Sequence, residues 1–338
     1  MRITECLFFV VGINWRSEME QRLLQRLFAH SDPATPRFAY QSTVNWMAAL
    51  SILCDSEAFS PEAMRSFYLA VPRRTVNEEA DTWCFENVFM MLHNMEALGE
   101  MSRKCEPLPV IRSAIITWYY TIYYAASGMV AAASGAKPET HAETAKTWHS
   151  DIAIRGHAIG PFGLHLNTLV PREVKAEVER LREGNRFALT KEATDEADAW
   201  GACVAYLSGT AGYEQEKVER LVRASRQFKE LGVSNFKTKR AAQLRDARLG
   251  KKPVNFLTQA SRYRGKANYR DSIYLSYGAN RTETLNTFLS NLDNVASSFA
   301  TMACRYMARR VEKGAWERFV EDLDNNSQIT VRHDVLGY

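Results

Sequence analysis

The chain has 338 residues, of which 46% are hydrophobic and 24% are charged, and its formal net charge is +4. This composition is typical of a soluble globular protein with enough chain to bury a sizeable core. The six cysteines include no C-x-x-C pair, which argues against a zinc knuckle or a disulfide framework and predicts reduced thiols in a cytoplasmic protein.

The hydrophobic pattern predicts an all-α or nearly all-α protein, a helical bundle with long central helices and a minor N-terminal strand. The strand is expected at Leu7–Val11, within an apolar run that is too short for a signal peptide. Beyond it, apolar residues recur with a period near 3.6. Helices are predicted at about 18–30, 60–70, 76–99, 107–136, 171–183, 191–208, 212–231, 235–249, 254–277 and 282–313.

One predicted helix has the length of a membrane span. No residue from Ser113 to Ala136 is charged, and about 20 apolar residues suffice to cross a bilayer. However, four tyrosines lie near the middle of this segment, whereas tyrosines of membrane helices prefer the two interfaces. We therefore expect a central helix that is buried on all sides in a helical bundle, and no membrane association.

The composition changes most clearly at 100–108. We accordingly predict an N-terminal helical region at 1–105 and a second helical domain at 106–338, which carries an elaboration near 150–230.

Four of the seven histidines lie eight residues apart, at His141, His149, His157 and His165. Eight residues advance about 12 Å along a helix, so His141 and His149 on one helix cannot converge on one metal ion. The sequence contains no G-x-x-x-x-G-K-[ST], G-x-G-x-x-G, H-E-x-x-H or G-x-S-x-G motif. We therefore predict no metal and no cofactor, and we interpret these histidines as loop and surface residues near a helix junction.

The charge distribution is uneven. Residues 217–270 contain 16 Lys or Arg and three acids, a net charge of +13, so the rest of the chain carries −9. Such asymmetry is typical of a polyanion-binding surface, and the alternatives are an acidic protein partner, self-pairing or a solvated face. The predicted contacts to nucleic acid are Lys237, Lys239, Arg240, Arg245, Arg248, Arg262, Arg264, Lys266, Tyr269 and Arg270.

Three of these cations share one side of a predicted helix. Arg262, Lys266 and Arg270 are spaced i, i+4 and i+8 and would form a ridge along which a phosphate backbone could lie. Tyr269 could stack on an unpaired base. The opposite side predicts a core stripe in which Tyr263 is buried; its members are Phe256, Ala260, Tyr263, Ala267, Tyr274 and Tyr277.

Three segments resemble HEPN domains. "WYYTIYYAASGMVAAASGAKPETHAETAKTW" resembles their helix, loop and Thr-His helix start, "RYRGKANYRDSIYLSYG" a later basic stretch, and "TFLSNLDNVASSFATMACRYMARRV" the closing long helix. The resemblance covers about 106–313. It implies a helical bundle, often dimeric, of the kind found in prokaryotic toxin–antitoxin and antiviral defence systems.

Many HEPN members cleave RNA with an Arg-x4-6-His motif, in which the cation holds phosphate and the imidazole transfers a proton. This chain lacks the motif, because its nearest approaches are Arg26-x3-His30 and Arg155-x-His157. We therefore predict a nucleic-acid-binding protein that favours RNA, is not itself catalytic, and acts as a homodimer or in a multi-subunit complex. The alternatives are a metal-independent ribonuclease, with His141, His149, Arg155 and His157 as weak catalytic candidates, and a scaffold that binds an acidic protein.

Overall fold

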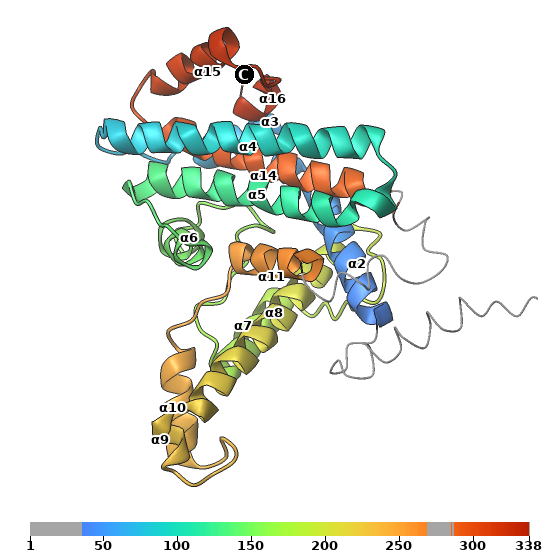
Figure 1. Ribbon diagram of the computed structural model, residues 1–338, viewed down its shortest axis with the longest axis vertical. Helices are drawn as coiled ribbons and strands as arrows, with labels where there is room; N and C mark the ends of the chain where they lie inside the picture. Colours follow the sequence, from blue (N-terminus) through green and yellow to red (C-terminus); the bar gives the residue numbers. More distant parts are fainter. Residues whose placement is uncertain (1–35, 269–284, 286, 338) are drawn as a thin grey trace, which may run out of the picture.

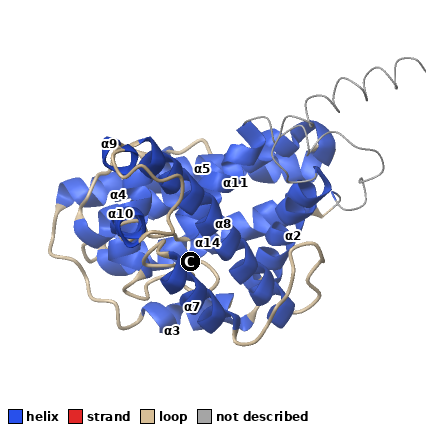
Figure 2. Cartoon of the chain, turned by 90° about the horizontal axis from the view of Figure 1, so that it is seen from below, coloured by secondary structure: helices blue, strands red, loops and turns tan. Residues whose placement is uncertain are grey.

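The computed structural model describes residues 36–268, 285 and 287–337, and these residues are predominantly helical (Figure 1). The predicted all-α fold class is confirmed for this part of the chain. Figure 2 shows helices and loops without a strand, and the β-type contact within the described residues is a single antiparallel bridge between Leu166 and Val254. The strand predicted at Leu7–Val11 and the helix predicted at 18–30 lie outside the described residues.

Three long helices lie side by side and form the bundle (Figure 1). They are α4 (Glu78–Lys104), α5 (Pro107–Ser134) and α14 (Phe288–Arg310). The stretch 100–108 comprises the end of α4, a turn at Cys105 and Glu106, and the start of α5, and these two helices pack against each other along the bundle. A single hydrophobic cluster extends from Val44 to Leu336.

The uncharged segment forms the centre of this bundle. Residues 125–132 of α5 are buried on all sides, and the small residues among them let the neighbouring helices approach closely; Gly128 faces the Met307 sulfur of α14. The prediction of a helix that is buried on all sides is thus confirmed for 125–132, whereas Tyr123 and Tyr124 are half-buried. No helix among the described residues combines the length and apolar character that a membrane crossing requires.

A second set of helices crosses beneath the bundle: α2 (Pro36–Cys54), α8 (Glu196–Ala224) and α11 (Phe256–Asn268). Aromatic side chains join the two sets. Trp46 of α2 stacks on Tyr206 of α8 with ring centroids 3.9 Å apart, and Tyr263 of α11 meets Trp46 at 5.0 Å. We call this cluster the aromatic joint; it comprises Trp46, Trp118, Tyr206, Phe256 and Tyr263.

Beyond the joint, α8 continues as one helix into a projection that we call the basic arm, residues 217–252 (Figure 1). The sequence predicts two helices here, with a break between 208 and 212, and that prediction is wrong. The packing of α8 on α2 offsets the low helix propensity of the glycines in this stretch. The arm also contains α9 (Arg226–Lys229) and α10 (Lys239–Leu249).

The remaining described helices are short, and α7 packs against α8 rather than on the bundle. They are η1 (Glu57–Phe59), α3 (Pro61–Tyr68), α6 (His141–Trp148), the π-type turn η2 (His149–Ala153), α7 (Pro171–Arg182), α15 (Ala315–Asn326) and α16 (His333–Leu336).

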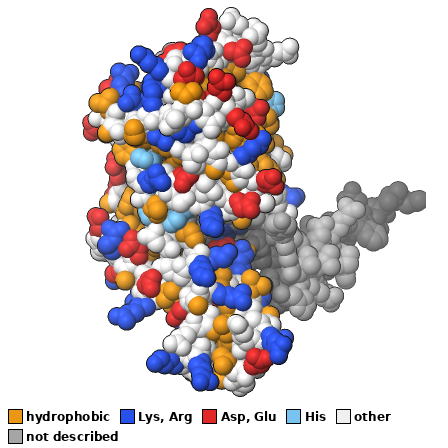
Figure 3. All heavy atoms as spheres, turned by 90° about the vertical axis from the view of Figure 1, so that its left-hand side faces the viewer, with side chains coloured by type: hydrophobic (Ala, Val, Ile, Leu, Met, Phe, Trp, Pro, Cys, Tyr) orange, Lys and Arg blue, Asp and Glu red, His pale blue; other side chains and the backbone are white. Residues whose placement is uncertain are grey.

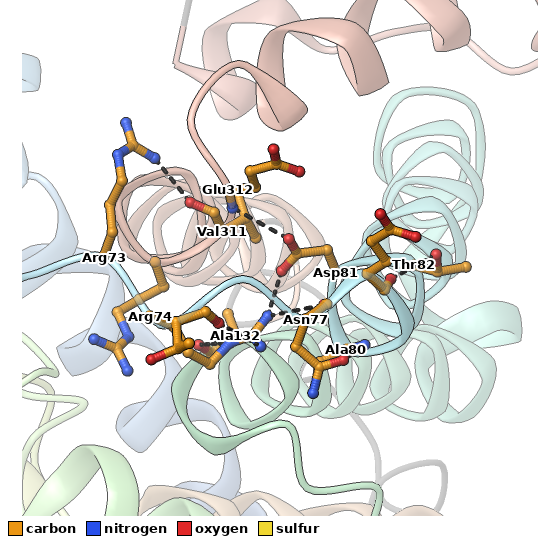
Figure 4. Close-up of polar contacts among 12 residues, drawn as sticks. Arg73, Arg74, Asn77, Ala80, Asp81, Thr82, Ala132, Val311 and Glu312 are labelled. Carbon is orange, nitrogen blue, oxygen red and sulfur yellow. Dashed lines mark hydrogen bonds and ion pairs between the residues drawn. The ribbon is translucent and has the colours of Figure 1, made fainter.

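A buried polar network closes one end of the bundle (Figure 4). Arg74, in the loop before α4, pairs with Asp81, and only 10% and 6% of their side-chain surfaces are exposed. The Arg74 Nε also donates to the Ala132 carbonyl of α5 at 3.1 Å, and the Glu312 amide donates to Asp81 at 3.1 Å. The network therefore satisfies carbonyls at the end of α5 that the helix itself leaves unpaired, and it links α4 and α5 to the chain after α14.

Candidate nucleic-acid interface

The basic arm carries twelve Lys or Arg and three acids. Eight of these cations are exposed and have no ion pair within the described chain. Figure 3 shows Lys and Arg side chains over the lower part of the molecule, where the arm lies. The eight are Arg220, Lys229, Lys237, Lys239, Arg240, Arg248, Lys251 and Lys252.

The other four cations of the arm pair with carboxylates. Arg245 is typical, because it contacts Asp246 at 2.8 Å and lies over the Phe236 ring. It therefore helps to fasten α10 to the rest of the arm, and its role as a phosphate contact stays a prediction. The remaining three pairs are Lys217 with Glu214, Arg223 with Glu219, and Arg226 with Glu230.

The start of α10 concentrates positive charge. Thr238 caps the helix by accepting the Ala241 amide, Lys239 and Arg240 follow, and no acid occupies the first turn. The amino end of a helix carries partial positive charge, so cations there are locally unfavourable and an anion is favoured. This arrangement weakens the helix slightly and suits a site that binds phosphate.

The cations of α11 face the protein instead. Arg262 donates to the Thr210 hydroxyl at 3.1 Å and lies over the Tyr213 ring, while Lys266 donates to Ser42 and Thr43 of α2. The two share a ridge, as their spacing predicts, but the ridge packs on α8 and α2. Tyr269 and Arg270 lie outside the described residues.

The core stripe on the other side of α11 is confirmed as far as the structure describes it. Tyr263 is fully buried, and its hydroxyl donates to the Thr43 carbonyl at 3.0 Å. Phe256, Ala260 and Ala267 are buried with it, whereas Tyr274 and Tyr277 lie outside the described residues.

His141, the first residue of α6, meets an arginine from a distant segment. The Arg264 guanidinium lies 3.4 Å from His141 Nε2, and the Tyr119 hydroxyl lies 3.0 Å from Nδ1. Because a guanidinium can only donate, Nε2 accepts and Nδ1 carries the proton that is donated to Tyr119. Burial, and then the charge of Arg264, lower the pKa of His141, so the imidazole is neutral near pH 7.

The other two histidine candidates have different surroundings. His149 and His165 lie with ring centroids 5.3 Å apart, and burial followed by the charge of His165 lowers the pKa of His149. His157 packs near Tyr306, and burial is the main cause of its lowered pKa. Arg155 is exposed and donates to the Ser150 carbonyl at 3.3 Å. Sequence spacing could not reveal the pairing of His141 with Arg264, which depends on how α6 packs on α11.

These histidines predict a pH dependence of stability. His141, His149 and His157 have lowered pKa values in the folded chain, whereas the ordinary value of 6.5 applies after unfolding. As the pH falls through and below 6.5, the unfolded chain therefore binds more protons, and the folded state loses stability. We expect the free energy of unfolding in urea to be lower at pH 5.5 than at pH 7.5.

In a triple His→Gln variant at 141, 149 and 157, the free energy of unfolding should differ less between pH 5.5 and pH 7.5 than it does in the wild type. The matched control is His93→Gln, because His93 is exposed on α4. In this control the free energy of unfolding should differ between the two pH values as much as in the wild type. An unchanged difference in the triple variant would contradict this assignment.

No group of three or more His, Cys, Asp or Glu within the described residues could hold a metal ion. Comparison with known proteins finds no matching family model, no matching curated protein and no matching solved structure.

Proposed function

We propose that this chain is a HEPN-like helical protein that binds nucleic acid through its basic face at 217–270 and is not itself catalytic. The observation that carries the proposal is the set of eight exposed cations on the basic arm that have no carboxylate partner in the described chain. Each such cation can contact a backbone phosphate and release counterions.

Two features favour nucleic acid over an acidic protein. Five of the eight cations are lysines, which are depleted in the buried centres of protein–protein interfaces. The start of α10 is also a local anion site. The proposed cytoplasmic location rests on the cysteine pattern. The preference for RNA, a homodimer or multi-subunit complex, and a place in antiviral defence or toxin–antitoxin systems follow from the resemblance to HEPN domains.

The test replaces Lys237, Lys239 and Arg240 together by Gln and measures binding to a single-stranded RNA at several salt concentrations. We expect the affinity at low salt to fall about tenfold or more and the slope of log K against log salt to decrease by about 2. Thermal stability should stay unchanged or rise slightly, because two cations leave the amino end of α10. The loss of binding would then not be a folding defect.

The matched control replaces Arg65, Lys313 and Arg318 by Gln. These exposed cations lie at the α3 and α15 side of the bundle, away from the arm (Figure 1). If both triple variants lose RNA affinity equally, the binding is a general attraction between RNA and a positively charged protein, and the proposed interface is overturned. If the wild-type chain binds neither RNA nor DNA, the remaining candidate is a scaffold that binds an acidic protein.

One observation favours a second candidate, a metal-independent ribonuclease. His141 and Arg264 lie within 3.4 Å of each other, so an imidazole base and a phosphate-binding cation are side by side. If the chain cleaves RNA, His141→Ala should abolish cleavage of total RNA, whereas His149→Ala and His157→Ala should retain it. No cleavage by the wild type, or full cleavage by His141→Ala, would remove this candidate.

A further inference from the structure

A pocket of about 400 Å³ lies between α6 and the segment that leaves the basic arm. Lys146 and Thr147 of α6 line one side, and Lys251, which directly follows α10, lines another. His149 and Asn167 also contribute to the lining. The pocket is thus built from segments that the fold brings together.

The lining carries net positive charge. Lys146 and Lys251 are both exposed, and neither has an ion pair within the described part of the chain. Glu143 is the acid of the lining, and its carboxylate accepts a hydrogen bond from the Thr140 hydroxyl at 3.1 Å. The Glu143 amide donates to the same hydroxyl at 3.2 Å, so Thr140 caps the start of α6 and also holds this carboxylate.

His149 supplies the deepest polar group of the lining. The residue is 9% exposed, and its Nδ1 is buried without a hydrogen-bond partner among the described residues. Buried polar atoms in folded proteins nearly always have a partner, so this unpaired ring nitrogen beside the pocket is a group that a polar ligand would satisfy.

We propose that this pocket binds a phosphomonoester, either the phosphate of a free nucleotide or the terminal phosphate of a nucleic-acid strand. The two lysines of the lining match a doubly charged phosphate, and Thr147 and Asn167 carry neutral hydrogen-bonding groups. The volume falls within the usual range for small-ligand sites. Because Lys251 adjoins α10, a nucleic-acid strand bound along the basic arm could end in this pocket. The terminal phosphate of a strand as ligand therefore rests on the proposed function, whereas a free nucleotide as ligand does not.

The first experiment measures binding of AMP and of adenosine to the full chain by titration calorimetry. AMP should bind measurably more tightly than adenosine, and Lys146→Gln/Lys251→Gln should weaken AMP binding about tenfold or more, as expected for the loss of charge-assisted contacts. Glu143→Gln keeps the acceptor for Thr140 and removes the negative charge, so it should tighten AMP binding. Lys313→Gln is the matched control and should bind AMP as the wild type does.

The second experiment compares RNA oligonucleotides with a 5′-phosphate, a 3′-phosphate or no terminal phosphate. A preference for one phosphorylated end that disappears in Lys146→Gln, which lies outside the basic arm, identifies the strand end as the ligand, and AMP binding without such a preference identifies a free nucleotide. The unphosphorylated strand should bind Lys146→Gln as tightly as the wild type and should bind the Lys237/Lys239/Arg240 variant only weakly, which separates failure of the pocket from failure of the arm. AMP that binds no better than adenosine, or binds the double variant as tightly as the wild type, overturns the proposal.

Discussion

Arg74→Ala is expected to lower the free energy of unfolding by about 3–5 kcal/mol, because it leaves the buried Asp81 carboxylate without its countercharge. Both side chains are at most 10% exposed, and Arg74 also bonds the Ala132 carbonyl at the end of α5. The substitution thus removes an ion pair and a helix-end contact together. Urea unfolding followed by circular dichroism measures the loss.

The matched control is Arg103→Ala, which removes the exposed partner of Glu100 at the other end of α4 and should hardly change stability. Asp81→Leu combined with Arg74→Met should recover part of the loss, because no unpaired charge stays buried. Recovery should be incomplete, since the Glu312 amide still lacks its acceptor. A change in Arg74→Ala as small as that in the control would show that the network contributes little.

Trp46→Ala is expected to cost about 3–5 kcal/mol, the usual range for emptying a large buried aromatic site. The ring is 1% exposed, stacks on Tyr206 at 3.9 Å and meets the Trp118 edge at 6.2 Å. These neighbours belong to α8 and α5, which also carry other contacts and cannot collapse fully into the space. Urea unfolding again gives the value.

Phe89→Ala is the control for this experiment, because Phe89 is an aromatic residue of α4 that is 38% exposed. It should change stability far less. We also expect faster hydrogen exchange of α8 and α11 amides in Trp46→Ala, since Trp46 contacts both helices at the aromatic joint. Unchanged exchange there would mean that the joint does not hold the arm to the bundle.

Local signals predicted much of the helical framework. The Ser-Pro start of α3 is a case in point, because Ser60 accepts the Ala63 amide at 3.2 Å and Pro61 occupies the first turn. The buried character of α5 followed from its uncharged sequence with tyrosines at the centre. Such features depend on neighbours within one or two helical turns, which a sequence displays directly.

The continuity of α8 could not be predicted from local sequence signals. Gly209 and Gly212 are helix breakers by propensity, and the sequence therefore suggested two helices. Packing against α2 outweighs that propensity. The outcome depends on residues far away in the chain.

The candidate site was predictable only in part. The concentration of cations at 217–270 is a property of the sequence, and the exposed lysines of the arm follow it. Helical spacing placed Arg262 and Lys266 on one side of α11, but it could not tell that this side meets α8 and α2. For the same reason the contact of His141 with Arg264 and the approach of His149 to His165 needed the tertiary structure.

The continuity of α8 has a consequence for the basic arm. Tyr206 and Ala224 belong to the same helix and are separated by about 27 Å at the usual helical rise. Because the helix is continuous, a tilt of its far end would also displace the Tyr206 ring, which stacks on the indole of Trp46. Contact at the tip is thereby coupled to the bundle through a single helix, with no loop in between.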